Sequence, residues 1–590
     1  MGSSKLISLA VAGIFIFSCG KSYLEKEPLG QLDEAAVANK KGVERLLIGT
    51  YSVLDGIGGN KGSWFSAASN WIYGSICGSE AYKGGSSEND QGPEITPVEL
   101  FTHTANNAAI ASKWGAVYDG VQRANDVLRM MKKAKDISPA DQKRIEAEAR
   151  FLRAHYHFEA KKMWNKIPFI DETISYENGN YRVSNNKDAW PDIENDLKFA
   201  IDNLEITPYA GAVGRANKYT AMAVLAKAYM FQKKFAQAKP LIETIITSNK
   251  YRLLENYGAN FDPANRNSAE SIFSVQVSVN DGSAGMNGNF GDVLNFPISG
   301  PGGGCCGFFQ PSQYLVNHFK TTAGLPELDH FNDVPVKNDE GLDIGDPFDP
   351  YAGPLDPRLD WTVGRRGIPY LDWGLHTGKD WIAAENFFFG PYSPKKNVYY
   401  KWQQGLLTDV SFWSNGTTTN NVNLIRYADV LLWAAEMEAE IGSLGQAEMY
   451  VNRIRKRMAD HHESWVHKYL DNDHPEAGSH TDDAHLAANY VISPYPNGYF
   501  NNKDMALKAI RFERMLELGM EGHRFFDLVR WGIANVEIHA YVDKEKLKRA
   551  YLGQSQFTKN KSEYFAIPQL QIDLSAGADG NAKMTQNPGY

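Results

Sequence analysis

Apolar residues in the first half of the chain recur at the spacing of amphipathic helices. The segment 114–131 has apolar residues spaced three, four or seven positions apart, namely Trp114, Val117, Tyr118, Val121, Leu128 and Met131. Side chains at these intervals share one face of a helix. The segment is therefore predicted to be a helix that buries this face.

A second helix is predicted to begin at Pro139. Ser138 provides an N-cap, Pro139 suits the first turn, and Asp141 brings a carboxylate to the N-terminal end. Its apolar positions are Ile145, Leu152, Tyr156 and Met163. Pro168 is expected to stop it, because a proline disfavours helical conformation in the residue before it.

Two further pairs of helices are predicted, one within 219–248 and one formed by 427–441 and 445–458. In the first pair, Leu225, Ala226, Tyr229 and Ala238 stand at the offsets where tetratricopeptide (TPR) hairpins interlock large and small side chains. Ala435 and Ala447 repeat the pattern in the second pair. Plain helix packing is the alternative interpretation.

Between these helical blocks, residues 255–420 are rich in Gly, Pro, Asn, Asp and aromatics, and only short pieces such as 271–279 look like strands. A second loop-like stretch, 56–104, is rich in Gly and Ser. Loops on a rigid framework commonly carry binding surfaces. We therefore expect the ligand site in these two regions.

Composition narrows the classes of partner. The 590 residues are 43% hydrophobic and 22% charged, which is typical of a globular protein and not of a disordered one. The net charge is −9, without a basic run, so nucleic acid is not expected to bind. Aromatic residues reach 12%, which supplies many flat apolar faces.

Four cysteines are too few for a scaffold held together by disulfides. Cys305 and Cys306 are adjacent and flanked by glycines, which permit unusual backbone conformations. They are either a vicinal disulfide or two reduced thiols in a loop.

The N-terminus indicates export. Lys5 precedes an apolar stretch from Ile7 to Phe17, which is shorter than the roughly 20 residues that span a bilayer. Residues 1–18 are interpreted as a signal peptide. Ser18-Cys19-Gly20 resembles a bacterial lipobox, which makes Cys19 the expected lipidation site, although Phe17 departs from the small residue preferred there. The alternative is cleavage elsewhere, with Cys19 incidental.

Several sequence motifs follow one another in a fixed order. They are Phe151-Leu152-Arg153-Ala154-His155-Tyr156 with Ile167-Pro168, residues 219–229, Asp356-Pro357-Arg358-Leu359, Ile425-Arg426-Tyr427-Ala428-Asp429-Val430-Leu431-Leu432, Arg511-Phe512-Glu513-Arg514, Gly522-His523-Arg524-Phe525-Phe526-Asp527-Leu528-Val529-Arg530-Trp531-Gly532, Tyr564-Phe565-Ala566-Ile567-Pro568 and Gln586-Asn587-Pro588-Gly589-Tyr590. This ordered set resembles the SusD/RagB family of outer-membrane nutrient-binding lipoproteins. Arg524, Asp527, Arg530 and Trp531 are expected to have a structural role, because Arg and Asp can pair on a helix.

The resemblance implies a mainly α fold, with a TPR-like helical-hairpin scaffold, an irregular loop-rich lobe and a few short strands. We expect one domain over 19–590, with the scaffold at about 30–254 and 421–590 and the lobe at about 255–420. The resemblance also implies a surface-exposed, lipid-anchored protein of the outer membrane. Such a protein binds a glycan and delivers it to a SusC-like TonB-dependent transporter, without catalysis or a cofactor.

Glycan binding needs aromatic faces for sugar rings and planar polar groups for hydroxyls. The candidate ligand-binding residues come from the two loop regions: Trp71, Tyr73, Tyr82, Phe308, Phe309, Trp373 and Trp381. For each, core packing is the competing role. A peptide-binding lid of the same type is the first alternative function. A glycoside hydrolase is the second, although no catalytic motif marks a carboxylate pair.

Histidines cluster near the end of the second helical block, at His461, His462, His467, His474, His480 and His485. His462 and His467 are five positions apart, one more than in the zinc-protease helix motif, so they would not share a helix face. A solvated insertion is the plain interpretation, and a metal site is the alternative.

Overall fold

The computed structural model describes residues 37–57, 63–87, 89–302, 305–382, 389–411, 413–474 and 481–590. The predicted signal peptide, Cys19 and His480 lie outside these ranges. Within them, no helix combines the length and the apolar character needed to cross a bilayer.

The fold is mainly helical, as the sequence predicted. The N-terminal helices are α2 (Lys40–Ser52), α3 (Gly92–Glu99), α4 (Ala108–Lys133), α5 (Pro139–Trp164), α6 (Trp190–Asn203), α7 (Lys218–Phe231) and α8 (Phe235–Thr247). The C-terminal helices are α12 (Tyr427–Ile441), α13 (Leu444–Asp460), α14 (Lys503–Leu518), α15 (Arg524–Trp531), α16 (Ala534–Glu545) and α17 (Gln569–Leu574).

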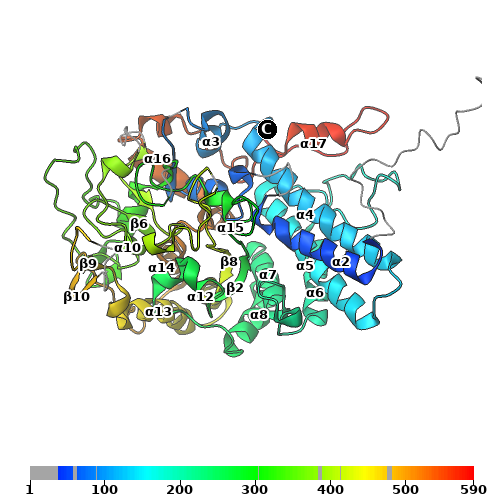
Figure 1. Cartoon of the computed structure of the whole chain (residues 1–590), viewed down its shortest axis with the longest axis horizontal. Helices are drawn as coiled ribbons and strands as arrows, with labels where there is room; N and C mark the ends of the chain where they lie inside the picture. The colour runs from blue at the N-terminus through cyan, green and yellow to red at the C-terminus, as the bar shows by residue number, and fades with distance from the viewer. Residues whose placement is uncertain are drawn as a thin grey trace, which may run out of the picture.

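The helices pack as a series of neighbours. Helix α4 contacts α5, α5 contacts α6, α6 contacts α7, and α7 contacts α8, which in turn contacts α12. The short connections of α7 to α8 and of α12 to α13 make each pair a hairpin, consistent with the TPR-like arrangement. Figure 1 shows α2, α4, α5 and α6 at one end of the molecule and the hairpin of β9 (His467–Tyr469) and β10 (Thr481–Leu486) at the other.

Local sequence explains where these helices begin and end. Ser138 caps α5 by accepting a hydrogen bond from Asp141 N (3.2 Å), with Pro139 as the first helical residue. The helix ends at Trp164, before Pro168, because Asn165 adopts a left-handed φ of 56°. Asn107 caps α4, and Asn217 caps α7 in the same way.

In the described part of residues 255–420, the α-helices and β-strands are all short. They are α9 (Gln313–His318), α10 (Leu359–Thr362), β2 (Ser271–Val275), β3 (Phe308–Pro311), β4 (Thr321–Thr322), β5 (Leu325–Pro326), β6 (Val363–Gly364) and β7 (Ser393–Pro394). Strand β2 pairs antiparallel with β8 (Val422–Arg426), which returns the chain to the helical part. The strand expected over 271–279 ends at Val275, since Val277 N bonds the side chain of Asn421 instead of a strand.

The stretch 56–104 differs from the surface loop that its Gly and Ser content predicted. It contains a π-helical turn at Trp71–Ile76 and β1 (Ala81–Gly84), and both are buried. Its glycines permit close packing. A Cβ on Gly74 would overlap the carbonyl group of Gly522. Gly522 has a left-handed φ of 76°, and a Cβ on it would overlap Ser69 O. The small residues therefore let this segment pack against the start of α15.

Candidate functional site

Five of the seven predicted ligand-binding residues are buried: Trp71, Tyr73, Tyr82, Phe308 and Phe309. The Trp71 ring packs against both phenylalanines, with centroids 6.2 and 5.8 Å apart, and its Nε1 donates to Gly291 O (3.2 Å). Tyr82 accepts from Gln313 N (3.0 Å), in the layer where β1 pairs with β3. Their rings have packing roles here, and their contact with a ligand stays a prediction.

The other two, Trp373 and Trp381, are half-buried in a small separate cluster. They pack on a core of Phe296, Tyr370, Val398 and Tyr399. Trp373 Nε1 donates to Tyr399 O (2.7 Å), and the Trp381 ring lies 5.6 Å from Tyr370. The structure thus separates these two tryptophans from the five buried aromatics, which belong to the main core or line its edge.

Among the described residues of the loop-rich part, two other tryptophans are the most exposed large aromatic groups, and sequence reasoning missed both. Trp402 is 54% exposed and Trp413 is 56% exposed. Both lie on residues 400–413, which we name the tryptophan loop, and of which residue 412 is not described. Their signal in the sequence is a pair of tryptophans in a polar, Gly-containing stretch without helix or strand periodicity.

The tryptophan loop is held at its base by hydrogen bonds to the backbone and to buried carboxylates. Asp409 N donates to Thr417 O (3.0 Å), and Thr419 N donates to Leu407 O (2.9 Å). Asp372, which is buried, accepts from Trp402 N (3.3 Å). The loop is therefore anchored while its two indole rings face outward.

A second loop, 278–289, lies against the tryptophan loop. The Asn280 side chain donates to Gly405 O (3.1 Å) and to Leu406 O (3.4 Å). Asp281 braces this second loop by accepting from Ser283 N (3.0 Å), and its hydrogen bonds, first from Ser278, lower its carboxyl pKa. Exposed apolar side chains join the two tryptophans on these loops: Met286, Leu406 and Val410.

A cavity of about 70 Å³, which we name the amide pocket, is lined by both polar and apolar side chains. Its walls carry six asparagines, Asn289, Asn295, Asn397, Asn420, Asn421 and Asn423. Residues from the segments 394–397 and 420–423 line the pocket. The tryptophan loop lies between these two segments in the sequence. The volume corresponds to about two water molecules.

Asp292 organises one side of the amide pocket. Its carboxylate accepts from Ser69 Oγ (2.6 Å), Asn289 Nδ2 (2.8 Å) and Asn295 Nδ2 (3.4 Å). Burial raises the pKa of Asp292 despite these bonds. Asn295 Oδ1 is buried without a hydrogen-bond partner among the described residues. Three side chains therefore hold the Asp292 carboxylate in the pocket wall.

The opposite wall is tied to the helical part by ion pairs. Lys396 Nζ lies 2.8 Å from Glu521 Oε1, and Arg426 Nε lies 2.9 Å from Glu521 Oε2. Arg426 also bonds Glu517 O (2.7 Å). Although burial opposes it, Arg426 and Lys396 hold the pKa of Glu521 below its usual range. The polar wall is thus fixed in place by the segment that precedes α15.

The motif at α15 is structural, as expected. Asp527 pairs with Arg530 (2.7 Å) and with Arg514 (2.8 Å). Arg530 continues to Glu436 (2.6 Å), which also accepts from Trp531 Nε1 (3.0 Å). All five side chains are buried, so this network joins α12, α14 and α15.

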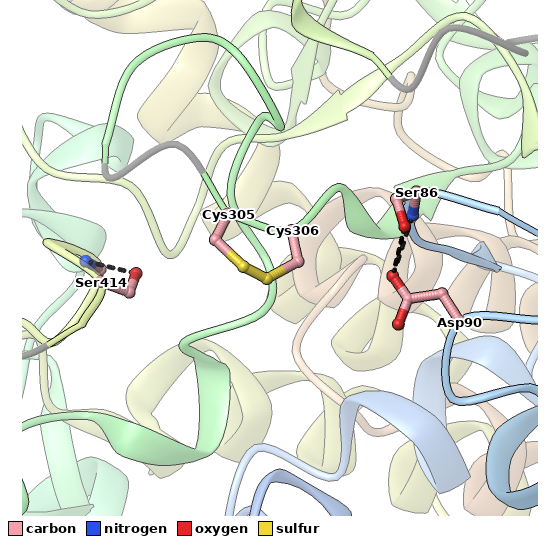
Figure 2. The surroundings of a disulfide bond; sticks show 6 residues. Ser86, Asp90, Cys305, Cys306 and Ser414 are labelled. Carbon is pink, nitrogen blue, oxygen red and sulfur yellow. Dashed lines mark hydrogen bonds between the residues drawn. A yellow bond between two sulfur atoms is a disulfide. The ribbon is translucent and has the colours of Figure 1, made fainter.

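Cys305 and Cys306 are joined as a vicinal disulfide, which is one of the two alternatives that the sequence left open. Figure 2 shows it with Ser414 on the side of Cys305 and Ser86 on the side of Cys306. Ser86 is held in its turn by Asp90, whose carboxylate accepts from Ser86 Oγ (2.9 Å).

The histidines of this segment contact neighbouring acidic side chains. His461 contacts Glu463 (2.8 Å), His474 contacts Asp471 (2.9 Å) and His485 contacts Asp482 (2.6 Å). Among the residues that the structure describes, no three His, Cys, Asp or Glu side chains are grouped as metal ligands would be.

Sequence comparisons identify relatives for nearly the whole chain. A model of the SusD family matches residues 269–590, and a model described as starch-binding associating with outer membrane matches residues 24–230. SusD-like protein P25 from Formosa agariphila is 26% identical over 554 residues, which are 90% of each chain.

Solved structures share the fold. A laminarin-binding SusD-like protein superposes with a TM-score of 0.62 at 21% identity, over 94% of this chain and 100% of that one. Surface glycan-binding protein A from Bacteroides thetaiotaomicron in complex with laminarihexaose gives a TM-score of 0.62 at 19% identity, over 93% and 99%.

Proposed function

Since this chain belongs to the SusD family, we propose that it is a surface lipoprotein that captures a glycan and delivers it to a SusC-like TonB-dependent transporter. The observation that carries the proposal is the tryptophan loop, where Trp402 and Trp413 expose their rings on an anchored framework. Exposed indole faces suit the apolar side of pyranose rings.

The surroundings of the loop favour a neutral, hydroxyl-rich ligand. Two nearby carboxylates, Asp372 and Asp409, are engaged in hydrogen bonds to the protein backbone. Lys396 is paired with Glu521. Amide groups line the pocket between the loop's two ends, and amides can donate to and accept from hydroxyls. The relatives named for laminarin and laminarihexaose make a β-glucan the first ligand to test.

Capture without cleavage agrees with the geometry. A glycoside hydrolase needs a protonated and an ionised carboxyl flanking the scissile bond. Asp292 and Glu521 have pKa values shifted in these two directions, but the cavity that they line is only about 70 Å³. A sugar ring is larger than the two waters that such a volume holds. We therefore expect the ligand to bind outside this cavity, against the tryptophan loop.

Calorimetry of the chain without residues 1–19 against laminarin, other plant and microbial glycans, and peptide mixtures tests the proposal. Binding of one glycan class, with the glycan recovered at unchanged length, is the expected result. Binding of peptides alone would replace the glycan with the peptide function. Recovery of shortened glycan would establish a hydrolase.

Delivery to a transporter needs a separate measurement. Co-purification of the full chain from outer membranes of its source is expected to bring a TonB-dependent barrel protein with it. Recovery of the glycan-binding chain alone, under conditions that retain other membrane complexes, would contradict the delivery step while leaving glycan capture intact.

A further inference from the structure

The loop between α6 and α7, residues 204–217, lines two surface cavities, and Arg215 belongs to both. The first cavity has a volume of about 660 Å³, and its other walls come mainly from α2. The second has a volume of about 310 Å³ and extends from the loop to β2. Small-molecule sites commonly measure roughly 300–1,000 Å³, so each cavity can hold a sugar unit, which the amide pocket cannot.

Exposed cations form one wall of the first cavity. Lys41 and Arg45 stand four positions apart on α2, and both side chains are exposed. Neither forms an ion pair within the described part of the chain. Ile48, one turn further along the helix, is 51% exposed. This wall therefore offers two positive charges beside an apolar surface.

The other charged groups around the first cavity are largely engaged with one another. They form the ion pairs of Lys40 with Asp141 (2.7 Å), Arg215 with Glu148 (2.8 Å) and Arg144 with Glu44. Asp136, the remaining carboxylate of the lining, accepts a hydrogen bond from the backbone N–H of Lys40 (2.8 Å). Lys41 and Arg45 therefore face one carboxylate that has no cationic side chain as its partner.

The second cavity adds positive charge and no acid. Arg215 and Lys250 are among the described residues that line it, whereas no Asp or Glu is. Lys250 is exposed, and its Nζ donates to Ile206 O (2.6 Å). Across both cavities, three cations without an ion pair stand against Asp136 alone, on a chain whose net charge is −9. Such a local reversal of sign attracts an anionic ligand.

Uncharged polar groups supply most of the remaining polar surface of the second cavity. They are the hydroxyl and amide side chains of Thr207, Asn217, Asn267, Ser268 and Ser271. Hydroxyl and amide groups both donate and accept hydrogen bonds, as the hydroxyls of a sugar do. The apolar side chain of Val213, which is 63% exposed, lies in the same lining. The composition suits a saccharide better than a bare ion.

Tyr209 brings an aromatic ring to the first cavity. The guanidinium carbon of Arg144 lies 3.7 Å from the centroid of this ring, and Tyr209 is still 40% exposed. Arg144 is itself fixed by ion pairs to Glu44 and Glu148 (3.0 Å to the latter). The ring is thus a braced surface against which the apolar face of a sugar can pack.

We infer that these two cavities bind an acidic saccharide, with its carboxylate or sulfate groups at Lys41, Arg45 and Lys250 and a sugar ring against Tyr209. An inorganic anion would meet the charges, but it would leave the aromatic ring and the hydroxyl and amide lining unused. The inference goes beyond the neutral-glycan site proposed at the tryptophan loop and does not depend on it.

Calorimetric titration of the chain without residues 1–19 tests the inference with two probes, a tetrasaccharide of galacturonic acid and a tetrasaccharide that carries sulfate esters. At least one is expected to bind, and the tighter of the two identifies the acidic group that the site prefers. Inorganic sulfate is titrated in parallel. Binding of neither saccharide, or binding of inorganic sulfate as tight as that of the saccharides, would overturn the inference.

Variants locate the site. The double change Lys41→Gln and Arg45→Gln is expected to raise the Kd for the acidic probe roughly tenfold, and Lys250→Gln to raise it about threefold. Lys456→Gln, which changes an exposed lysine on α13, is the matched control and should leave the Kd unchanged. Trp402→Ala should also leave it unchanged. The Tm should stay constant in the lysine and arginine variants, because these side chains are exposed.

Two outcomes of the variant series would contradict this location. A rise in Kd for Trp402→Ala, with none for the double variant, would place the acidic probe at the tryptophan loop. An equal rise for Lys456→Gln and for the double variant would show that the probe responds to overall charge and not to these cavities.

Discussion

Lys396 Nζ and Glu521 Oε1 are 2.8 Å apart, and this buried ion pair joins the loop-rich part of the chain to the segment before α15. Glu521 also holds Arg426, the last residue of β8, so one carboxylate fixes two walls of the amide pocket. The position of the tryptophan loop therefore depends on ion pairs that lie beneath it.

Lys396→Met is expected to lower the free energy of unfolding by about 3 kcal/mol, because it leaves Glu521 buried with one partner fewer. This loss is near the low end for a broken buried ion pair, because Arg426 still pairs with Glu521 in the variant. Chemical denaturation measures the effect. Lys198→Met, which removes an exposed lysine paired with Glu194 (3.4 Å), serves as the control and should change stability little. Equal effects of the two changes would contradict a stabilising pair.

Trp402→Ala and Trp413→Ala are each expected to raise the Kd for the glycan roughly tenfold, since an exposed aromatic anchor contributes about 1–2 kcal/mol of binding free energy. The Tm should hardly move, because both rings are more than half exposed. Calorimetric titration provides the comparison. Tyr176→Ala removes a more exposed ring, 82% exposed, between α5 and α6 and is the matched control. Unchanged affinity in both tryptophan variants would place the ligand elsewhere.

Glu99→Gln is expected to stabilise the protein increasingly as the pH rises from 4.5 to 7. Burial raises the Glu99 pKa from 4.5 to about 7, so the folded chain keeps a proton that the unfolded chain releases. The wild-type free energy of unfolding therefore falls through that interval, by at most about 3 kcal/mol from this group.

Glutamine suits the site because Glu99 Oε1 accepts from Tyr551 Oη (2.9 Å), while Oε2 has no hydrogen-bond partner among the described residues. Denaturation curves of both proteins, taken at several pH values, give the difference. The other buried carboxyl groups are present in both proteins, so their contributions cancel in the difference between the two free energies of unfolding. A stability difference that stays constant from pH 4.5 to 7.5 would show that Glu99 titrates normally.

Gly522→Ala is expected to destabilise the chain by at least about 2 kcal/mol more than Gly532→Ala. Both glycines have a left-handed φ, but a Cβ on Gly522 would overlap Ser69 O, whereas nothing lies within 4 Å of one on Gly532. Both variants carry the backbone strain of an alanine at a left-handed φ, so the difference between their Tm values measures the effect of the overlap with Ser69. Similar Tm values would mean that Ser69 can move away freely.

Cys19→Ala is expected to release the protein from the membrane fraction while leaving its Tm unchanged, since acyl chains on this cysteine would provide the anchor. Fractionation of cells that express the full chain provides the measurement. The wild-type chain expressed in parallel is the reference. Retention of the variant in outer membranes would contradict lipidation at Cys19.

The helical part of the fold was largely predictable. The apolar intervals around Trp114 and the Ser138 cap located α4 and α5, because both features act within a few residues of the chain. The structural role of Arg524, Asp527 and Arg530 also followed from local spacing. The family resemblance added the order of the motifs.

The candidate surface was not predictable in the same way. Trp71 and Trp402 both stand in polar, Gly-containing stretches, yet Trp71 is buried and Trp402 is exposed. Their exposure depends on what packs against each segment: α15 and β3 cover the π-helical turn of Trp71, whereas the tryptophan loop is held from below.

By itself, the sequence determined the helices, their caps and the family, since these follow from spacing along the chain and from ordered motifs. The tertiary structure alone decided which aromatic rings face solvent and that Lys396 meets Glu521. These relationships join residues that are distant in the sequence, and burial is a property of the packed whole, so no local pattern records them.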